Sequence, residues 1–373
     1  MAFSVLETEK DNLTKPVANL HESAKNVKVT VILPCYRGKD TVERCVNSII
    51  QQKFQDLELI VIDDNGGDSI RVVSRTLNKS SIAYKIVIHE TNKGIANTLN
   101  EGLKLALGDY ILIVHQDCEL LDNFHIEDAV KFLDLNPDVA VLGGSPQYPV
   151  DEFNFFEKVF MIESGHFTKK DRAGIEEVSF SEHKCDIFRK EVLMKSGGFD
   201  SKHFRASAED QMVSWKIRNL GYKIVKSNNL RYLQRYGKSV STFAGLIKKT
   251  FYYSKTQSGV ILLTQGKVLK GSSLKTNDQK MRIINRLTGT IFAMLFLFSL
   301  VPLIIFSEPL LALVSSGIVF IRAMHLAQKA KAFGIKANWL ILFGMGLVGF
   351  LGDLAYLTGL SYGTLLTFMK KRL

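Results

Sequence analysis

The stretch DYILIVHQDCE, residues 109–119, gives the clearest sign of how this chain folds. Its apolar part, residues 110–114, is too short for a helix and has the composition of a strand buried on both faces of a parallel sheet. Asp117 and Glu119 follow at the carboxyl end of that strand. Ligands of open α/β sheets bind at this end, so the position suits an acid that holds a divalent metal against a phosphate; a solvated loop acid is the simpler interpretation.

A run of the same character lies nearer the N-terminus. Residues 27–33 (VKVTVIL) are rich in β-branched residues and lead into Pro34-Cys35-Tyr36, after which residues 41–52 repeat apolar residues at helical spacing. This order predicts a strand, a loop and a helix. Tyr36 would stand at the carboxyl end of the strand, where its ring could stack on a nucleobase.

Two further runs follow. Residues 57–62 (LELIVI) end in Asp63 and Asp64, and residues 84–89 (YKIVIH) precede a helical pattern over residues 92–107. Strands that alternate with helices are typical of parallel βαβ units. The groups that follow these strands should therefore meet in one nucleotide crevice, which would offer a ring for stacking, carboxylates for hydrogen bonds and a carboxylate for a metal.

The C-terminal part of the chain is unusually apolar. The chain has 373 residues, of which 46% are hydrophobic and 24 are Phe, a high share for a wholly soluble protein. Residues 287–306, 309–326 and 339–360 are each close to the length that spans a bilayer. Core helices of a soluble protein need polar outer faces, which these stretches lack. We therefore predict membrane helices.

The charges around these segments give part of a topology. Basic residues before the first segment and at residues 329–336 both favour the inside, as a membrane hairpin requires. Residues 370–372 (KKR) would lie outside if residues 339–360 spanned the membrane once, although basic residues prefer the inside. Gly352-Asp353 interrupts this last segment, so a single span and a re-entrant pair of half-helices both stay open.

The N-terminal residues, the cysteines and the net charge argue against a secreted protein, a disulfide-rich protein and a nucleic-acid-binding protein, respectively. The N-terminal residues have no apolar core and no cleavage site of a secretory signal, so we expect the catalytic part to lie in the cytoplasm. The four cysteines are scattered without CxxC spacing, which predicts reduced thiols. The net charge of +11 does not indicate nucleic acid, because basic and aromatic residues interleave only over residues 238–270, where they suit anionic lipid headgroups.

Four stretches together resemble the inverting glycosyltransferases of family 2, which have the GT-A fold. They are VILPCYRGKDTVERCVNSIIQQ (31–52), ELIVIDDNGGD (58–68), NKGIANTLNEGLKLALGDYILIVHQD (92–117) and GGFDSKHFRASAEDQMVSWKIRNLGYKI (197–224). The resemblance extends over about residues 28–226. It implies an α/β catalytic domain with a Rossmann-like, mostly parallel sheet, followed by a C-terminal α-helical transmembrane region. The expected divisions are an N-terminal extension (1–27), a GT-A domain (28–236), a basic juxtamembrane region (237–282) and transmembrane helices (283–373).

The resemblance also implies a donor site. Tyr36 would stack on the nucleobase, and Asp64 would accept a hydrogen bond from the edge of the base, with Asp63 nearby. From the residues themselves, a core aromatic and an Asx turn are the alternatives. Arg235 suits a diphosphate, although a contact with interfacial lipid is equally compatible. The residues expected to bind the nucleotide sugar are Pro34, Tyr36, Asp63, Asp64, Asn92, Gln116 and Arg235.

The expected metal site departs from the DxD motif of the family, because its triplet is His115-Gln116-Asp117. Asp117 alone can bridge Mg²⁺ or Mn²⁺ to a diphosphate, since such cations take one or two carboxylates with phosphate oxygens and waters. Glu119 is either a second ligand or a surface acid. His115 is a Mn²⁺ ligand, a ribose contact or a structural residue. The expected metal residues are Asp117 and Glu119.

The pair Glu209-Asp210 is the candidate for the catalytic base. An inverting transfer needs a carboxylate that takes the proton of an acceptor hydroxyl while its oxygen attacks the anomeric carbon. The resemblance places this role at Asp210, beside Glu209, where a helical pattern over residues 211–220 begins. The alternative is that an acid in a first turn only complements the helix dipole.

These expectations combine into a membrane-anchored enzyme that faces the cytoplasm and moves one hexose from a UDP- or GDP-linked sugar to an acceptor at the membrane, in the first place a polyprenyl-linked glycan. One alternative is a polyprenyl-phosphate sugar synthase, whose ionised phosphate acceptor needs no strong base. A non-catalytic membrane scaffold is another, favoured by the incomplete DxD motif. The expected partners are the donor, the acceptor and membrane lipids; the oligomeric state is left open.

Overall fold

The computed structural model describes residues 17–19, 27–164, 174–237, 239–269, 277–306, 309–332 and 334–369. The chain divides into two compact units. The sheet unit comprises Met1–Gln147 and Lys170–Arg235, and the helical unit comprises Tyr148–Lys169 and Tyr236–Leu373. The predicted N-terminal extension lies almost entirely outside the described residues, as do the basic residues 370–372.

The units are divided differently from the predicted domains in the middle of the chain. Residues 28–236 were predicted to form one catalytic domain, whereas residues 148–169, with helix α6 (Phe155–Ser164), cluster with the helical unit. The apolar side chains of α6 explain the difference. Val159 and Phe160 are buried in a cluster that also contains Leu342. A segment that is inserted between strands of the sheet therefore completes the core of the C-terminal helices.

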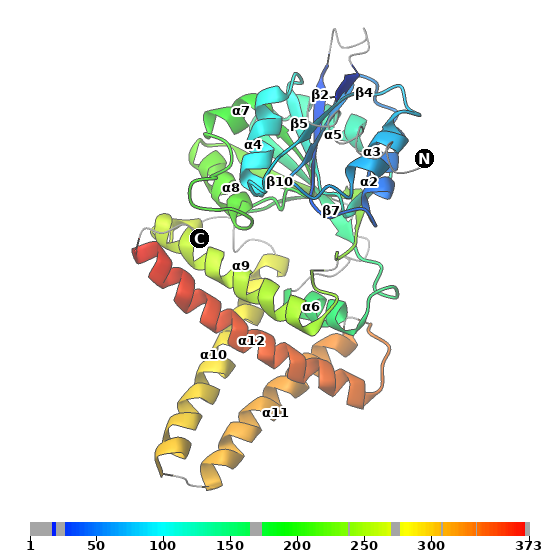
Figure 1. The fold of residues 1–373 in the computed structure, drawn as a ribbon. Coiled ribbons are helices and arrows are strands. Elements are labelled where there is room, and N and C mark those ends of the chain that lie inside the picture. Colours follow the sequence, from blue (N-terminus) through cyan, green and yellow to red (C-terminus); the bar gives the residue numbers. More distant parts are fainter. Residues whose placement is uncertain are drawn as a thin grey trace. The chain divides into compact units, whose positions relative to one another are not determined.

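One mixed sheet forms the centre of the sheet unit. Its strands in the described residues are β1 (Val17–Asn19), β2 (Val29–Cys35), β3 (Leu57–Asp63), β4 (Ala83–Ile88), β5 (Tyr110–Val114), β6 (Cys118–Leu120), β7 (Val139–Gln147), β8 (Ile175–Glu177), β9 (Cys185–Arg189) and β10 (Lys223–Gln234). The order is β1-β4-β3-β2-β5-β9-β7-β10-β6, and β8 pairs with β10. Strands β4, β3, β2 and β5 are parallel neighbours, whereas β9 runs antiparallel to β5 and β7 (Figure 1). The carboxyl ends of β2, β3 and β5 therefore lie at one edge.

Helices cover both faces of this sheet (Figure 1). One face carries α2 (Val42–Ile50), α3 (Ile70–Leu77) and α5 (His125–Leu135), and the other carries α4 (Ile95–Leu105), α7 (Lys190–Lys195) and α8 (Glu209–Asn219). Val31 and Leu33 belong to the first apolar cluster, and Ile32 between them belongs to the second. Successive strand side chains point to opposite faces, so a strand covered on both faces needs an unbroken apolar run. The predicted α/β class is confirmed.

The helical unit packs its helices closely. Besides α6 it contains α9 (Phe243–Leu263), the short 3₁₀ helix η2 (Lys267–Leu269), α10 (Asn277–Phe306), α11 (Pro309–Ala332) and α12 (Trp339–Phe368). A Cβ at Gly346 of α12 would collide with the carbonyl oxygen of Ala323 in α11, and one at Gly363 with the carbonyl oxygen of Lys255 in α9. Small residues on α12 therefore let the backbones of both neighbours approach.

Helix α12 settles one alternative that the sequence left open. It is continuous over 30 residues, so Gly352-Asp353 does not break it into re-entrant halves. Asp353 is tolerated inside the helix because it forms a buried ion pair with Arg322 of α11, with an Nε–Oδ2 distance of 2.7 Å. The polar interruption in the sequence is a contact between helices.

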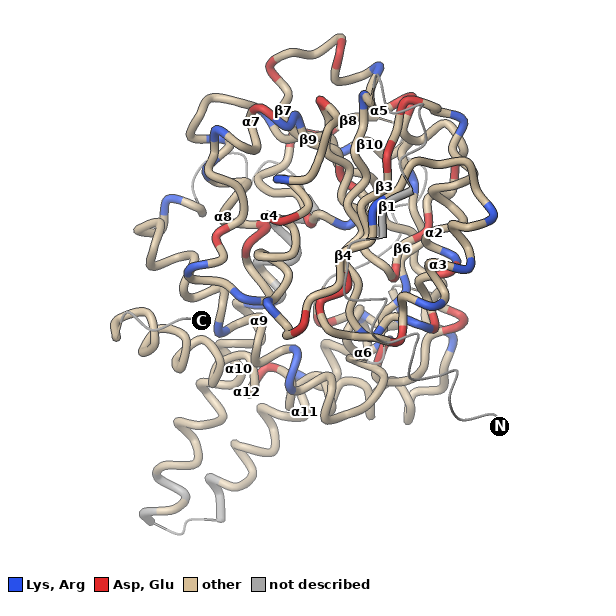
Figure 2. Tube along the Cα trace, turned by 45° about the horizontal axis from the view of Figure 1, so that its top comes forward, with Lys and Arg blue, Asp and Glu red and all other residues tan. Residues whose placement is uncertain are grey.

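The apolar character of the helices is uneven. Among the described residues, α12 alone is long and apolar enough to cross a membrane, with a mean hydropathy of 1.9 in its most apolar window. The apolar part of α10 is shorter, Arg286–Val301. In Figure 2 the described residues of the outer parts of α10 and α11 are tan, without Lys, Arg, Asp or Glu. The three membrane segments proposed from the sequence stay a prediction.

Candidate functional site

Tyr36 follows β2 directly and its side chain is accessible. The residue is 41% exposed, and the guanidinium of Arg37 lies over its ring, 5.1 Å from the centroid. This exposure contradicts the core-aromatic alternative, and Arg37 lies over one face of the ring. Pro34, in contrast, is buried within β2, where it lies opposite Ile62. It shapes the strand and does not line an open surface.

Gln116, from the loop after β5, clamps the loop after β2. Its Oε1 accepts a hydrogen bond from the backbone N–H of Tyr36 at 3.0 Å, and its Nε2 donates to the carbonyl oxygen of Tyr36 at 2.8 Å. A Cβ at Gly38 would collide with this amide. Gln116, which was expected to bind the donor, instead bonds to the backbone of Tyr36 and fixes the loop that carries this ring.

Asp63 shapes the turn after β3. Its two carboxylate oxygens accept hydrogen bonds from the backbone N–H groups of Gly66 and Gly67, at 3.0 and 2.8 Å. The side chain is buried. Burial raises the pKa of Asp63, and the two amide bonds oppose this shift. The turn is thus held by Asp63, through N–H groups three and four residues on, whereas the Asx turn offered as the alternative had been assigned to Asp64.

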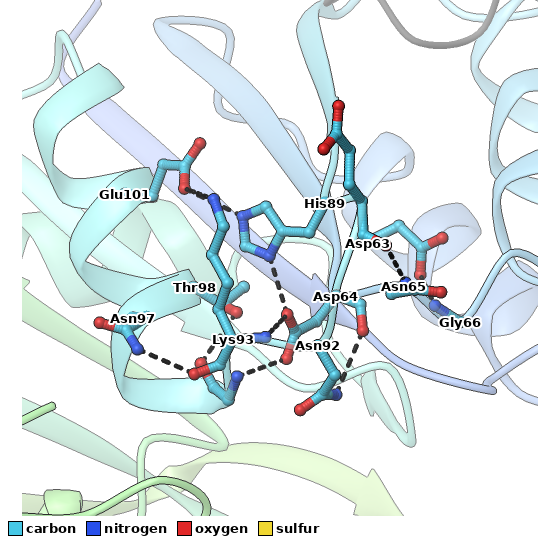
Figure 3. A network of polar contacts seen from close by, with 12 residues as sticks. Asp63, Asp64, Asn65, Gly66, His89, Asn92, Lys93, Asn97, Thr98 and Glu101 are labelled. Atoms are coloured by element: carbon cyan, nitrogen blue, oxygen red, sulfur yellow. Dashed lines mark hydrogen bonds and ion pairs between the residues drawn. The ribbon is translucent and has the colours of Figure 1, made fainter.

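Asp64 joins β3 to the start of α4 (Figure 3). Its Oδ1 accepts from the backbone N–H of Lys93 at 2.7 Å and its Oδ2 from that of Gly94 at 2.8 Å. His89 Nδ1 lies 2.8 Å from Oδ1, and the other ring nitrogen, Nε2, lies 2.9 Å from Oε2 of Glu101. These bonds make Asp64 a rigid, buried acceptor directly after the carboxyl end of β3.

His89 and Glu101 were not among the site residues predicted from the sequence, although one signal was present. His89 ends the run YKIVIH and so occupies the same strand-end position as Tyr36 and Asp64. Asn92, which was expected to bind the donor, donates from Nδ2 to the carbonyl oxygen of Asp64 at 3.2 Å. Its own Oδ1 accepts from Arg205 at 2.9 Å. Asn92 thus connects the network with a segment far along the chain.

Asp117 and Glu119 have different surroundings. Glu119 is ion-paired with Arg235 and, at 3.4 Å, with Nε of Arg44, so its charge is compensated within the protein. This arrangement argues against Glu119 as a metal ligand and against Arg235 as a residue that is free to bind a diphosphate. Asp117 is partly exposed, and its Oδ1 lies 3.8 Å from the thiol of Cys118.

A metal at this position would have a simple donor set. Within the described residues no group of three or more His, Cys, Asp or Glu side chains is arranged to hold an ion. A single hard carboxylate such as Asp117 nevertheless fits Mg²⁺ or Mn²⁺, because these cations complete their coordination with substrate phosphates and waters. The residues present therefore fit a metal that arrives together with the donor.

Glu209 and Asp210 form the first turn of α8, directly after Ala208. Ala208 has a φ of 71°, in the left-handed region that non-glycine residues avoid. Glu209 is buried, and its Oε2 has no hydrogen-bond partner among the described residues. Burial raises the pKa of Glu209, and the charge of Asp210 adds to the shift. A poorly solvated acidic pair therefore stands on a strained turn.

Asp210 is partly exposed and accepts a hydrogen bond from the backbone N–H of Gln211 at 2.8 Å. Burial raises its pKa, the charge of Glu182 adds to the shift, and the charge of Lys184 opposes it. Glu182 and Lys184 pair with each other at 3.1 Å. Sequence patterns contain no signal for these two residues, because they belong to no motif and only the fold brings them near Asp210.

Comparisons with known proteins agree with this geometry. Residues 30–197 match the sequence model of the family described as Glycosyl transferase family 2. The match contains Tyr36, Asp64 and Asp117 but ends before Glu209-Asp210.

Similar proteins include poly-beta-1,6-N-acetyl-D-glucosamine synthases. The synthase from Staphylococcus epidermidis is 26% identical over 202 residues, which cover 52% of this chain and 47% of that protein. The synthase from Staphylococcus aureus is 24% identical over 199 residues, with the same coverage of both chains. The chain thus spans about half the length of the curated relatives it matches.

A solved structure shows the same fold. The mannosyltransferase PcManGT from Pyrobaculum calidifontis, in complex with GDP-Man and Mn²⁺, is 18% identical and has a TM-score of 0.54, covering 97% of this chain and 93% of that one. The GT-A-like fold predicted for the α/β domain is confirmed.

Proposed function

We propose that this chain is a membrane-bound, inverting glycosyltransferase that moves a hexose from a nucleotide sugar to an acceptor at the membrane surface. One observation carries the proposal. In a family 2 domain, three parallel strands end at one sheet edge in an exposed ring (Tyr36), a rigid carboxylate (Asp64) and a partly exposed carboxylate (Asp117). The ring can stack on a nucleobase, the rigid carboxylate can accept a hydrogen bond from the pairing edge of that nucleobase, and the third group can hold a metal-bound diphosphate.

The donor is a uridine or guanosine diphosphate sugar. Asp64 uses three of about four acceptor positions of its carboxylate within the protein, which leaves one on Oδ2. Uracil and guanine offer an N–H in the middle of their pairing edge, whereas cytosine and adenine offer an acceptor there. A carboxylate therefore favours the first two bases. The related structure of PcManGT holds GDP-Man.

Asp117 would hold a divalent cation against the diphosphate. When bound, Mg²⁺ or Mn²⁺ neutralises the charge that develops on the leaving group. Because Glu119 is paired with Arg235, Asp117 would be the single carboxylate for the cation. The donor's phosphate oxygens would complete the coordination, so the affinity for the cation should increase when the donor is bound.

Asp210 would take the proton of the acceptor hydroxyl. Its raised pKa, with burial as the main cause, makes it a stronger base than an ordinary Asp. A phosphate acceptor is ionised already and needs no such base. The Glu209-Asp210 pair therefore favours a hydroxyl, such as that of a polyprenyl-linked glycan, over a polyprenyl phosphate.

The helical unit would anchor the enzyme. Helix α12 has the length and composition of a membrane helix, and α9 carries Lys248 and Lys249 in its first half. Basic residues near a membrane segment prefer the cytoplasmic side and anionic headgroups. We place the sheet unit on that side, where it would meet its nucleotide sugar.

The test is a panel of nucleotide sugars added to membranes that contain the full chain, followed by mass spectrometry of the extracted lipids. We expect a hexose to be added to a glycolipid from a UDP or GDP sugar. Addition of the hexose directly to polyprenyl phosphate would establish the alternative acceptor. If none of the nucleotide sugars is consumed, the proposed transferase activity is contradicted and the non-catalytic scaffold is supported.

A further inference from the structure

His89 lies between two carboxylates in the sheet unit (Figure 3). Nδ1 is 2.8 Å from Oδ1 of Asp64, and Nε2 is 2.9 Å from Oε2 of Glu101. The side chain of His89 is only 1% exposed. Lys93 completes the group, because its Nζ lies 3.3 Å from the same oxygen of Glu101. The backbone N–H of His89 donates to the carbonyl oxygen of Asp63 at 2.9 Å, which fixes the ring to the end of β3.

The hydrogen bonds of this group require two ring protons. Ionised carboxylates only accept, and a neutral imidazole has a single N–H. A donor at each ring nitrogen satisfies both carboxylates at once.

These contacts determine which acceptor position of Asp64 is not used within the protein. Oδ1 is occupied by His89 and by the amide of Lys93, and Oδ2 by the amide of Gly94. The free acceptor position is therefore on Oδ2. Without His89, Oδ1 keeps only the amide of Lys93, so a second acceptor position opens on Oδ1 and the carboxylate no longer presents a single acceptor direction.

We propose that His89, supported by Glu101, is a positioning residue that aims Asp64 at the nucleobase of the donor and thereby sets the preference for uracil or guanine over cytosine. This inference rests on the proposed function of the crevice. A site built around one hydrogen bond to an N–H group rejects a ligand without that group much more strongly than a merely well-shaped site does.

The experiment measures the affinities of UDP, GDP and CDP for the full-length protein in detergent by calorimetry, so that no transfer reaction is needed. Two substitutions separate the two ring contacts. His89→Asn keeps a donor at the place of Nδ1, toward Asp64, and His89→Gln keeps one at the place of Nε2, toward Glu101. Glu101→Gln removes the supporting charge. Glu127→Gln is the matched control, because Glu127 also pairs with a lysine on a helix surface, Lys131, and has no ion pair with a histidine among the described residues.

We expect His89→Gln to weaken the preferred nucleotide about ten- to a hundredfold while CDP binding changes little, since a charge-assisted hydrogen bond is lost. His89→Asn should stay within about threefold of wild type, and Glu101→Gln should lose about three- to tenfold. Glu127→Gln should have no effect. Melting temperatures report whether each variant is folded, and if His89→Gln does not fold, the predicted loss in Glu101→Gln carries the test.

Equal losses in His89→Asn and His89→Gln, or an unchanged ratio of UDP or GDP to CDP affinity in the variants, would overturn the inference and leave His89 as a packing residue. In that case the wild-type protein still binds its nucleotide and the proposed function stands. Wild-type protein that binds none of the three diphosphates would overturn both the proposed function and the inference.

Discussion

The two acidic pairs of the sheet unit, Asp63-Asp64 and Glu209-Asp210, have opposite surroundings. The first pair accepts hydrogen bonds from four backbone N–H groups, of Gly66, Gly67, Lys93 and Gly94. The second pair is poorly supplied with donors: Oε2 of Glu209 has none among the described residues, and Oδ1 of Asp210 accepts from its neighbour Gln211.

This difference indicates how each pair can be used. Carboxylates that are held by amides are rigid and suited to recognition, because their lone pairs point in fixed directions. Carboxylates that are buried with few donors have a raised pKa and are suited to proton transfer. Substitutions in and around the two pairs can test this division of roles.

The largest effect is expected from Asp210→Asn. Positioned general base catalysis typically contributes about 10² to 10⁴-fold, so kcat should fall by that factor with little change in nucleotide affinity. Asp128→Asn is the matched control, because Asp128 also lies in a first turn, that of α5, and complements a helix dipole there. Retention of more than about a tenth of kcat in Asp210→Asn would make the polyprenyl-phosphate acceptor the better interpretation.

The next effect is expected at Asp117, which belongs to neither pair. Asp117→Asn should lower kcat and metal-dependent donor binding by about ten- to a hundredfold, since a neutral amide holds a hard cation poorly. Chelation with EDTA should reproduce the loss in the wild type and add little in the variant. Circular dichroism checks the fold. Full activity of the variant in the presence of chelator would remove the metal from the mechanism.

A smaller effect on stability is expected at Asp63. The side-chain amide introduced by Asp63→Asn would turn an NH₂ group toward one of the two glycine N–H groups, so the free energy of unfolding should fall by about 1–3 kcal/mol. Urea denaturation of the two proteins gives the difference. Asp56→Asn, at the exposed residue just before β3, is the control and should change stability by less than about 0.5 kcal/mol. An equal loss in both variants would show that the hydrogen bonds from the two glycine amides to Asp63 do not contribute to the free energy of unfolding.

The smallest effect is a shift of the pH profile. A base must be ionised, so activity should rise with pH through the raised pKa of Asp210. Because the charge of Glu182 adds to this shift and that of Lys184 opposes it, Glu182→Gln should move the acidic limb of kcat/KM to lower pH and Lys184→Met to higher pH. If both variants shift the profile in the same direction, or neither shifts it, the charges of Glu182 and Lys184 do not act on the catalytic base.

Much of the site follows from local patterns. The apolar runs before Tyr36, Asp64 and Asp117 indicated buried parallel strands, and parallel strands bring their carboxyl ends together whatever lies between them. Partners distant in the sequence could not be found in this way. Glu119 meets Arg235 only because β6 pairs with β10, and His89 meets Glu101 only because α4 packs back along the sheet.

The sequence by itself determined the strand and helix periods, the acids at the strand ends and the apolar C-terminal segments, because each depends on neighbours within a few residues. The tertiary structure decided which acids are satisfied, that α6 joins the C-terminal helices, and that α12 runs through Gly352-Asp353. The physical reason is the same in each case. A buried polar or apolar group needs a partner, and when the local chain does not supply it, a distant segment must do so.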